Sequence, residues 1–165
     1  MKKLIKSLFN FSREIVIPVI PTHNMKLAFY KAKHGTKIDK IVAAAIGSEY
    51  SHVELVFSDG ICFSASPRDK GVRFKTINLD NGKWDLYKID KQFYEEMLKK
   101  QVKRFEGQPY DTLGAIGSGI GIPLYSTKKK FCSLIIACIF QLDNINQNPE
   151  SLRRILLKKG YISKM

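Results

Sequence analysis

Residues 51–67 read SHVELVFSDGICFSASP, and this segment carries the clearest secondary-structure signal in the chain. Every second residue from Val53 to Phe57 is hydrophobic, which is the pattern of a half-buried strand. Residues 58–60, Ser-Asp-Gly, have the composition of a tight turn, and the apolar run 61–65 then returns. The stretch therefore predicts a β-hairpin with Val53, Leu55 and Phe57 on a buried face.

The segments around this hairpin predict an α+β domain over residues 25–165. The expected strands are 25–32, 72–77 and 84–89, and the expected helices are 37–46, 93–105, 132–142 and 150–159. Residues 109–121 predict a loop, whose glycine-rich part 114–121 is expected to form one wall of a cleft or a mobile lid. A helix, then antiparallel strands, then helices is the element order of an α+β fold.

Residues 1–24 form a separate basic N-terminal segment in this interpretation. Leu4, Leu8 and Phe9 lie among lysines, which favours a short amphipathic helix over residues 2–11. Residues 15–21 carry two prolines and predict an extended connector. Charged residues interrupt the apolar run and no small-residue cleavage site follows, so secretion is the less favoured alternative.

The composition indicates a folded domain with a strongly basic surface. The chain has 165 residues, with 28 Lys and Arg against 15 Asp and Glu, for a formal net charge of +13. Such a surface attracts anions, including anionic lipids, acidic polymers and nucleic acid. No basic run is interleaved with aromatic residues, so a nucleic-acid stacking platform is the weaker interpretation.

Three cysteines, Cys62, Cys132 and Cys138, argue against a disulfide framework. The chain has no Cys-x-x-Cys pair and its histidines are far apart, so no zinc-site spacing is present. We expect free thiols, no metal and no cofactor. A reducing, cytoplasmic location follows, with a peripheral membrane or virion-associated location as alternatives.

Two places in the chain carry residues suited to catalysis. His52 and Glu54 are two apart on a strand, so they share one face at a spacing of ~7 Å. A carboxylate in that position can orient the imidazole and raise its basicity. Cys132 follows Lys128–Lys130 and begins an apolar helix, where the helix dipole favours the thiolate. The simpler alternatives are an exposed polar strand face and a small buried cysteine. Cys62 and Cys138 are expected in the core.

A helix-borne thiol and a strand-borne imidazole are the two halves of a papain-type site. The motifs in chain order are residues 51–56, 64–67, 71–72, 107–111 and 131–133. Together they resemble the circularly permuted branch of the NlpC-type papain-like superfamily, which includes YiiX- and YebB-like proteins and the lecithin:retinol acyltransferase group. This resemblance implies an antiparallel sheet packed against helices, with the nucleophile on a buried helix in the C-terminal half.

The resemblance also implies roles for individual residues. Cys132 corresponds to the nucleophile and His52 to the general base. Glu54 is the expected third residue that orients His52, with Ser64 as the alternative. Tyr110 resembles a tyrosine near the oxyanion position, and ordinary aromatic packing near the cleft is the other interpretation.

The leading functional hypothesis is a cysteine hydrolase that cleaves an amide, isopeptide or ester bond through an acyl-thioester intermediate. Its expected substrates are cell-wall peptides, acidic proteins or lipids. One alternative is a non-catalytic basic module on the same fold that binds nucleic acid or a membrane surface. The other is an acyltransferase that works at a membrane surface, held there by residues 1–24.

Overall fold

The computed structural model describes residues 24–37, 40, 43–44, 47–119, 128–143 and 147–165. The predicted N-terminal amphipathic helix and its connector lie outside these residues. The predicted helix over residues 37–46 lies largely outside them as well.

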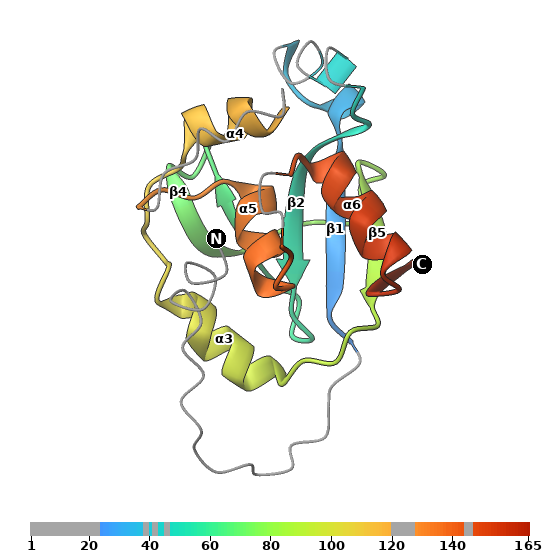
Figure 1. The fold of residues 1–165 in the computed structure, drawn as a ribbon, viewed down its shortest axis with the longest axis vertical. Coiled ribbons are helices and arrows are strands. Elements are labelled where there is room, and N and C mark those ends of the chain that lie inside the picture. The colour runs from blue at the N-terminus through green and yellow to red at the C-terminus, as the bar shows by residue number, and fades with distance from the viewer. Residues whose placement is uncertain (1–23, 38–39, 41–42, 45–46, 120–127, 144–146) are drawn as a thin grey trace.

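A six-stranded antiparallel sheet forms the centre of the described structure, with the strand order β4-β3-β2-β1-β5-β6 (Figure 1). The strands are β1 (Lys26–Lys31), β2 (Tyr50–Val56), β3 (Ile61–Ser66), β4 (Gly71–Thr76), β5 (Trp84–Ile89) and β6 (Ile162–Lys164). The predicted hairpin is the pair β2 and β3, and the other three expected strands are also confirmed. The short strand β6 was not predicted, because three residues show no readable alternation.

Four α-helices in the described ranges accompany the sheet. They are α3 (Glu95–Lys103), α4 (Thr112–Gly119), α5 (Cys132–Ile139) and α6 (Pro149–Lys158), and a short 3₁₀ turn, η1, spans Ala32–His34. Helices α5 and α6 cover one face of the sheet (Figure 1). The fold is therefore α+β, as the element order predicted. Within the described ranges, the helices are too short or too polar to cross a bilayer.

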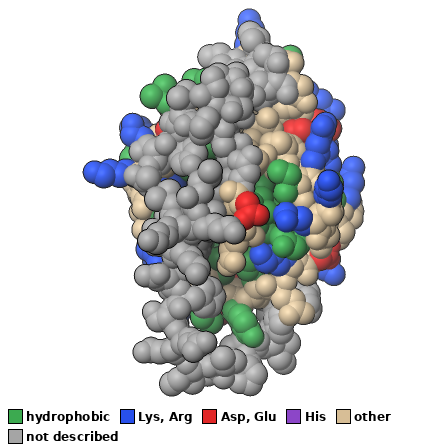
Figure 2. All heavy atoms as spheres, viewed as in Figure 1, with side chains coloured by type: hydrophobic (Ala, Val, Ile, Leu, Met, Phe, Trp, Pro, Cys, Tyr) green, Lys and Arg blue, Asp and Glu red, His purple; other side chains and the backbone are tan. Residues whose placement is uncertain are grey.

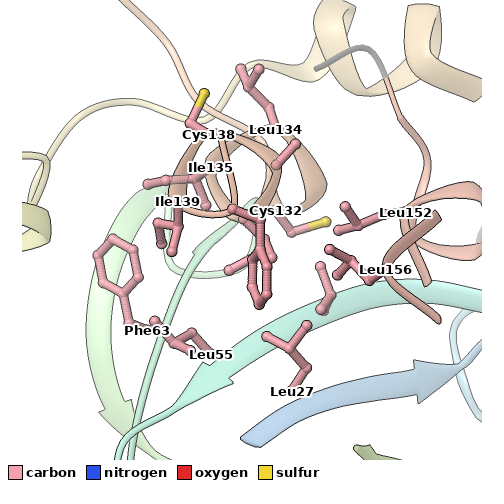
Figure 3. Packing of buried hydrophobic residues seen from close by; sticks show 14 of the residues in the cluster. Leu27, Leu55, Phe63, Cys132, Leu134, Ile135, Cys138, Ile139, Leu152 and Leu156 are labelled. Atoms are coloured by element: carbon pink, nitrogen blue, oxygen red, sulfur yellow. The ribbon is translucent and has the colours of Figure 1, made fainter. Parts of the chain in front are cut away.

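The main core lies between this sheet face and the helices α5 and α6. Leu27, Leu55 and Phe63 point from the strands toward α5 and α6 (Figure 3). Val53, Leu55 and Phe57 are buried, as the alternation predicted. A second, smaller cluster of Ala28, Val56 and Cys62 lies on the opposite face. Strand β2 is thus buried on both faces near its C-terminal end, at Leu55 and Val56.

Helix α4 corrects the prediction of a loop over residues 109–121. Its first turn is capped by the buried Asp111, whose Oδ1 accepts the Gly114 amide at 3.0 Å. A Cβ at Gly114 would lie 2.6 Å from Asp111 Oδ2, so this glycine permits close packing. The sequence interpretation weighed the low helix propensity of glycine and overlooked the cap.

The segment before α5 is anchored to the β4 edge of the sheet. Residue Gly71 pairs with Pro109, and Tyr110 pairs in turn with Lys130. The Asp111 amide donates to the Lys130 carbonyl at 2.8 Å. These contacts fix where helix α5 begins. They require the backbone at Gly71 to lie against that of Gln108, so closely that a Cβ at Gly71 would be 2.1 Å from the Gln108 carbonyl oxygen.

The basic residues gather at the surface as the composition predicted. In the described part of the face shown in Figure 2, Lys and Arg side chains outnumber Asp and Glu side chains. Several of the acidic groups are paired with basic ones, as in the contacts Asp85–Lys31 and Glu150–Arg153.

Replacing Gly71 by alanine is expected to destabilise the fold by about 3 kcal/mol, because backbone on both sides of the close approach resists the added methyl group. Urea unfolding of Gly71→Ala measures this loss. The matched control is Gly82→Ala, where a Cβ meets open space but φ is +74°. There we expect about 1 kcal/mol from backbone strain alone. Equal losses in the two variants would contradict the close approach at Gly71.

Candidate active site

Cys132 is the first residue of α5, and it lies where the positive end of the helix dipole acts on its thiol. Its residue exposure is 4%. The sulfur atoms of Cys132 and Cys138 point to different sides of the helix (Figure 3). The two thiols therefore lie in different surroundings, as the sequence predicted.

An opening in the sheet brings the Cys132 sulfur to the β2 backbone. In the described sheet, β2 and β3 pair at Leu55↔Phe63 and Val56↔Cys62, although both strands continue beyond these positions. Past the last pair, the Val53 amide interacts with the Cys132 sulfur, and Ser64 Oγ donates to the Val53 carbonyl at 2.7 Å. The Val53 backbone groups, which a continued ladder would use, thus bond to the first residue of α5 and to the Ser64 side chain.

His52 lies on β2 beside this opening, with 18% of its side chain exposed. Its Nε2 is 2.6 Å from Glu54 Oε1, and the ring also forms a hydrogen bond with the Cys132 side chain. Burial disfavours charge on the ring, but the negative charges of Cys132 and Glu54 outweigh burial and raise the pKa of His52 to about 10. The arrangement therefore favours an imidazolium at neutral pH.

The pKa of the Cys132 thiol shifts the opposite way. Burial by itself raises this pKa, but the charge and hydrogen bond of His52, with help from the Val53 amide, lower it below the ordinary value of a cysteine. A lowered thiol pKa and a raised imidazole pKa together stabilise a thiolate–imidazolium pair.

Glu54 is completely buried, and its charge is matched by two cationic partners. Besides His52, the Arg73 guanidinium donates to both carboxylate oxygens, at 2.7 Å to Oε2 and 2.5 Å to Oε1. Burial raises the pKa of Glu54, but His52 and Arg73 outweigh burial and lower it. Glu54 thus stays ionised and fixed in orientation.

Arg73 is a site residue that the sequence interpretation missed. It lies on β4, two strands from Glu54, and it reaches the carboxylate past Ser64, its partner on β3. Asp69 accepts from the Arg73 Nε at 2.9 Å and lies 2.9 Å from Lys75 Nζ. The available signal was a cation on a strand beside a buried carboxylate, which becomes informative only after the strand register is known.

The structure brings together three of the five predicted site residues in one chain of contacts, Cys132, His52 and Glu54. Ser64, the alternative third residue, is buried and donates to the Val53 carbonyl instead of to His52. Tyr110 lines the hollow next to His52. Burial raises the pKa values of Cys62 and Cys138 to about 11 each, as expected for core thiols.

A hollow of about 320 Å³ adjoins His52 on the sheet face opposite α5 and α6. His52, Tyr30 and Trp84 occupy adjacent positions on β2, β1 and β5 and form part of its floor. All three thiols are free. Over the described ranges, His, Cys, Asp and Glu side chains form no group of three or more that would hold a metal ion.

Comparisons of the chain with protein families, curated proteins and solved structures found no match.

The rate of Cys132 alkylation by iodoacetamide is expected to reach its plateau at a lower pH than that of an ordinary cysteine, because the reaction follows the thiolate fraction and the Cys132 pKa is lowered. In His52→Ala the rate at pH 6 should fall at least about tenfold and then rise with pH, since the supporting charge is lost. Peptide mass spectrometry assigns the label, with Cys62 and Cys138 as internal controls. A pH-dependent wild-type rate equal to that of the variant would contradict the ion pair.

Replacing Arg73 by methionine is expected to destabilise the fold by about 3 kcal/mol, because Glu54 then stays buried with one cationic partner fewer. The second change Glu54→Gln should restore part of this loss by removing the charge. The Glu54 pKa is lowered on folding, so its contribution is present at neutral pH and is lost as pH falls below about 4. Urea unfolding at pH 7 and pH 3 measures both effects, and additive losses in the double variant would argue against the contact.

Proposed function

We propose that this protein is a cysteine hydrolase that cleaves an amide, isopeptide or ester bond through an acyl-thioester on Cys132. One observation carries the proposal: a continuous chain of contacts links the Cys132 thiol at a helix N-terminus to His52, Glu54 and Arg73. Perturbed titratable groups of this kind beside a hollow are typical of catalytic sites.

The chemistry follows from the charges in the site. The Cys132 thiolate attacks the substrate carbonyl carbon and forms a carbon–sulfur bond, while the carbonyl oxygen takes up the negative charge. As this intermediate collapses, the bond to the leaving nitrogen or oxygen breaks, and the His52 imidazolium donates its proton to that atom. An acyl-thioester and a neutral imidazole result.

The second half of the reaction restores the enzyme. Neutral His52 takes a proton from water, whose oxygen attacks the thioester carbonyl, and the carbon–sulfur bond breaks to release an acid and the thiolate. Another nucleophile in place of water makes the same site an acyltransferase. Glu54 keeps the ring oriented through both steps, and Arg73 keeps Glu54 ionised.

The oxyanion would be stabilised by donors at the start of α5. The Cys132 amide belongs to the first helical turn, whose N–H groups are not used within the helix. Tyr110 is the candidate second donor, since it lines the hollow beside His52. Only 4% of Cys132 is exposed, so neighbouring side chains have to shift before a carbonyl reaches the sulfur.

The order of the site residues along the chain supports a permuted papain-like arrangement. The histidine strand β2 comes first and the nucleophile helix α5 comes much later, and the two lie in contact. This order agrees with the resemblance found in the motifs. Substrates of this class include cell-wall peptides and acidic protein or lipid groups, to which a chain of net charge +13 is electrostatically attracted.

The test uses p-nitrophenyl acetate, an activated ester small enough to reach a narrow site. We expect a burst of nitrophenolate matching the enzyme concentration, with the acetyl group mapped to Cys132 by peptide mass spectrometry. Cys132→Ser should lose the burst, and Glu54→Gln should slow it about tenfold or more. Cys138→Ala is the matched control and should retain it, because Cys138 lies on the other side of α5 (Figure 3).

The competing hypothesis of a non-catalytic basic module predicts a different result. It predicts acetylation that is slow, spread over several side chains and unchanged in Cys132→Ser. Steeply salt-dependent binding to duplex DNA or anionic vesicles, together with such unspecific acetylation, would reject the hydrolase.

A further inference from the structure

The hollow beside His52 has a defined position relative to the reacting atoms. It is lined by His52 but not by Cys132, so it lies on the imidazole side of the pair. In the proposed reaction the imidazolium protonates the leaving group, while the acyl group stays on the sulfur. The hollow is therefore placed to receive the leaving-group part of the substrate.

One side of the hollow is aromatic. Trp84 and Tyr30 pack edge to face with ring centroids 4.9 Å apart, and the Trp84 ring centroid is 6.3 Å from that of His52. The Tyr30 hydroxyl donates to the His34 carbonyl at 2.7 Å, which holds that ring in place. A fixed aromatic wall of this kind favours a flat or apolar group.

The other side of the hollow is cationic. Arg68, Arg73 and Lys75 line it, against the acidic residues Glu54 and Asp69. Glu54 is completely buried, whereas 52% of the Lys75 side chain is exposed and Arg68 is also exposed. Glu54 is thus deep and paired, Asp69 is 25% exposed and pairs with Arg73 and Lys75, and the exposed Arg68 and Lys75 carry positive charge toward the solvent.

We propose that this hollow binds a leaving group that carries a negative charge on a flat or apolar body. The body packs on Trp84 and Tyr30, and the anion lies near Arg68 and Lys75. The charges of His52 and Cys132 cancel in their ion pair, and the other charged lining residues are the three cations Arg68, Arg73 and Lys75 and the two anions Glu54 and Asp69, which is a net charge of +1. The assignment of this ligand as the leaving group rests on the proposed function. The binding of a flat anion in the hollow does not.

Binding can be measured without turnover, because Trp84 is the sole tryptophan of the chain and lines the hollow. Titration of the unmodified protein with 3-hydroxybenzoate should change the Trp84 fluorescence saturably. Phenol and 3-hydroxyphenyl-trimethylammonium, which have the same ring with no charge or a positive charge, should bind at least about tenfold more weakly. Equal affinities for the three compounds would overturn the proposal.

Variants identify the cationic side. Arg68→Gln and Lys75→Gln should each weaken 3-hydroxybenzoate about three- to tenfold and leave phenol unchanged. The matched control is Lys158→Gln, an exposed lysine on α6, which packs on the opposite face of the sheet. If Lys158→Gln weakens the anion as much as the other two, the effect comes from the net charge of the molecule and the assigned site is wrong.

The link to catalysis is tested with the acetate esters of the same three phenols. Acetylation of Cys132 should be at least about tenfold faster from the 3-carboxyphenyl ester than from the trimethylammonio ester, and Arg68→Gln should reduce this preference. Acetylation of Cys132 at equal rates from all three esters would reject the leaving-group assignment and leave the hydrolase intact. Failure of every ester to acetylate Cys132 would reject the hydrolase, while the fluorescence titration would still decide the anion site.

Discussion

The buried carboxylate of Glu54 is the constraint on which the described site depends. A carboxylate completely removed from water is costly unless cations and hydrogen bonds compensate for the lost hydration. His52 on its own strand and Arg73 from two strands away supply this compensation. The contacts that compensate the Glu54 charge therefore hold the His52 ring in one orientation and connect β4 to β2 through Arg73.

A second constraint is the opening between β2 and β3. A regular ladder would use the Val53 amide and carbonyl for pairing, but here they meet the Cys132 sulfur and the Ser64 hydroxyl. Every backbone polar group near the opening still needs a partner, so the start of α5 and a serine replace the missing ladder bonds. Through this opening the Cys132 thiol on α5 reaches the His52 ring, although His52 points to the face opposite the main core.

The two faces of the sheet hold the main core and the hollow, and Cys132 links them, because it belongs to the core cluster while its side chain contacts His52. On one face, Leu27, Leu55 and Phe63 pack against α5 and α6 (Figure 3). On the other face, His52 adjoins the hollow and the smaller cluster around Ala28. Alternation along β2 sends Val53 and Leu55 to the first face and His52 and Glu54 to the second, so a single strand serves both.

The sequence alone determined most of the elements, because alternation and helical periodicity are local properties of the chain. It also selected His52, Glu54 and Cys132 as candidates, since a histidine and a carboxylate two apart on a strand and a cysteine at a helix start are local patterns. Three features became visible only in the folded chain: Arg73 contacts Glu54, Ser64 bonds to backbone, and residues 112–119 are helical. The Arg73 contact depends on strand register and the Ser64 bond on the opening in the sheet, and both join residues that are distant in the chain. The helix depends on the cap at Asp111, which outweighs the low helix propensity of its glycines.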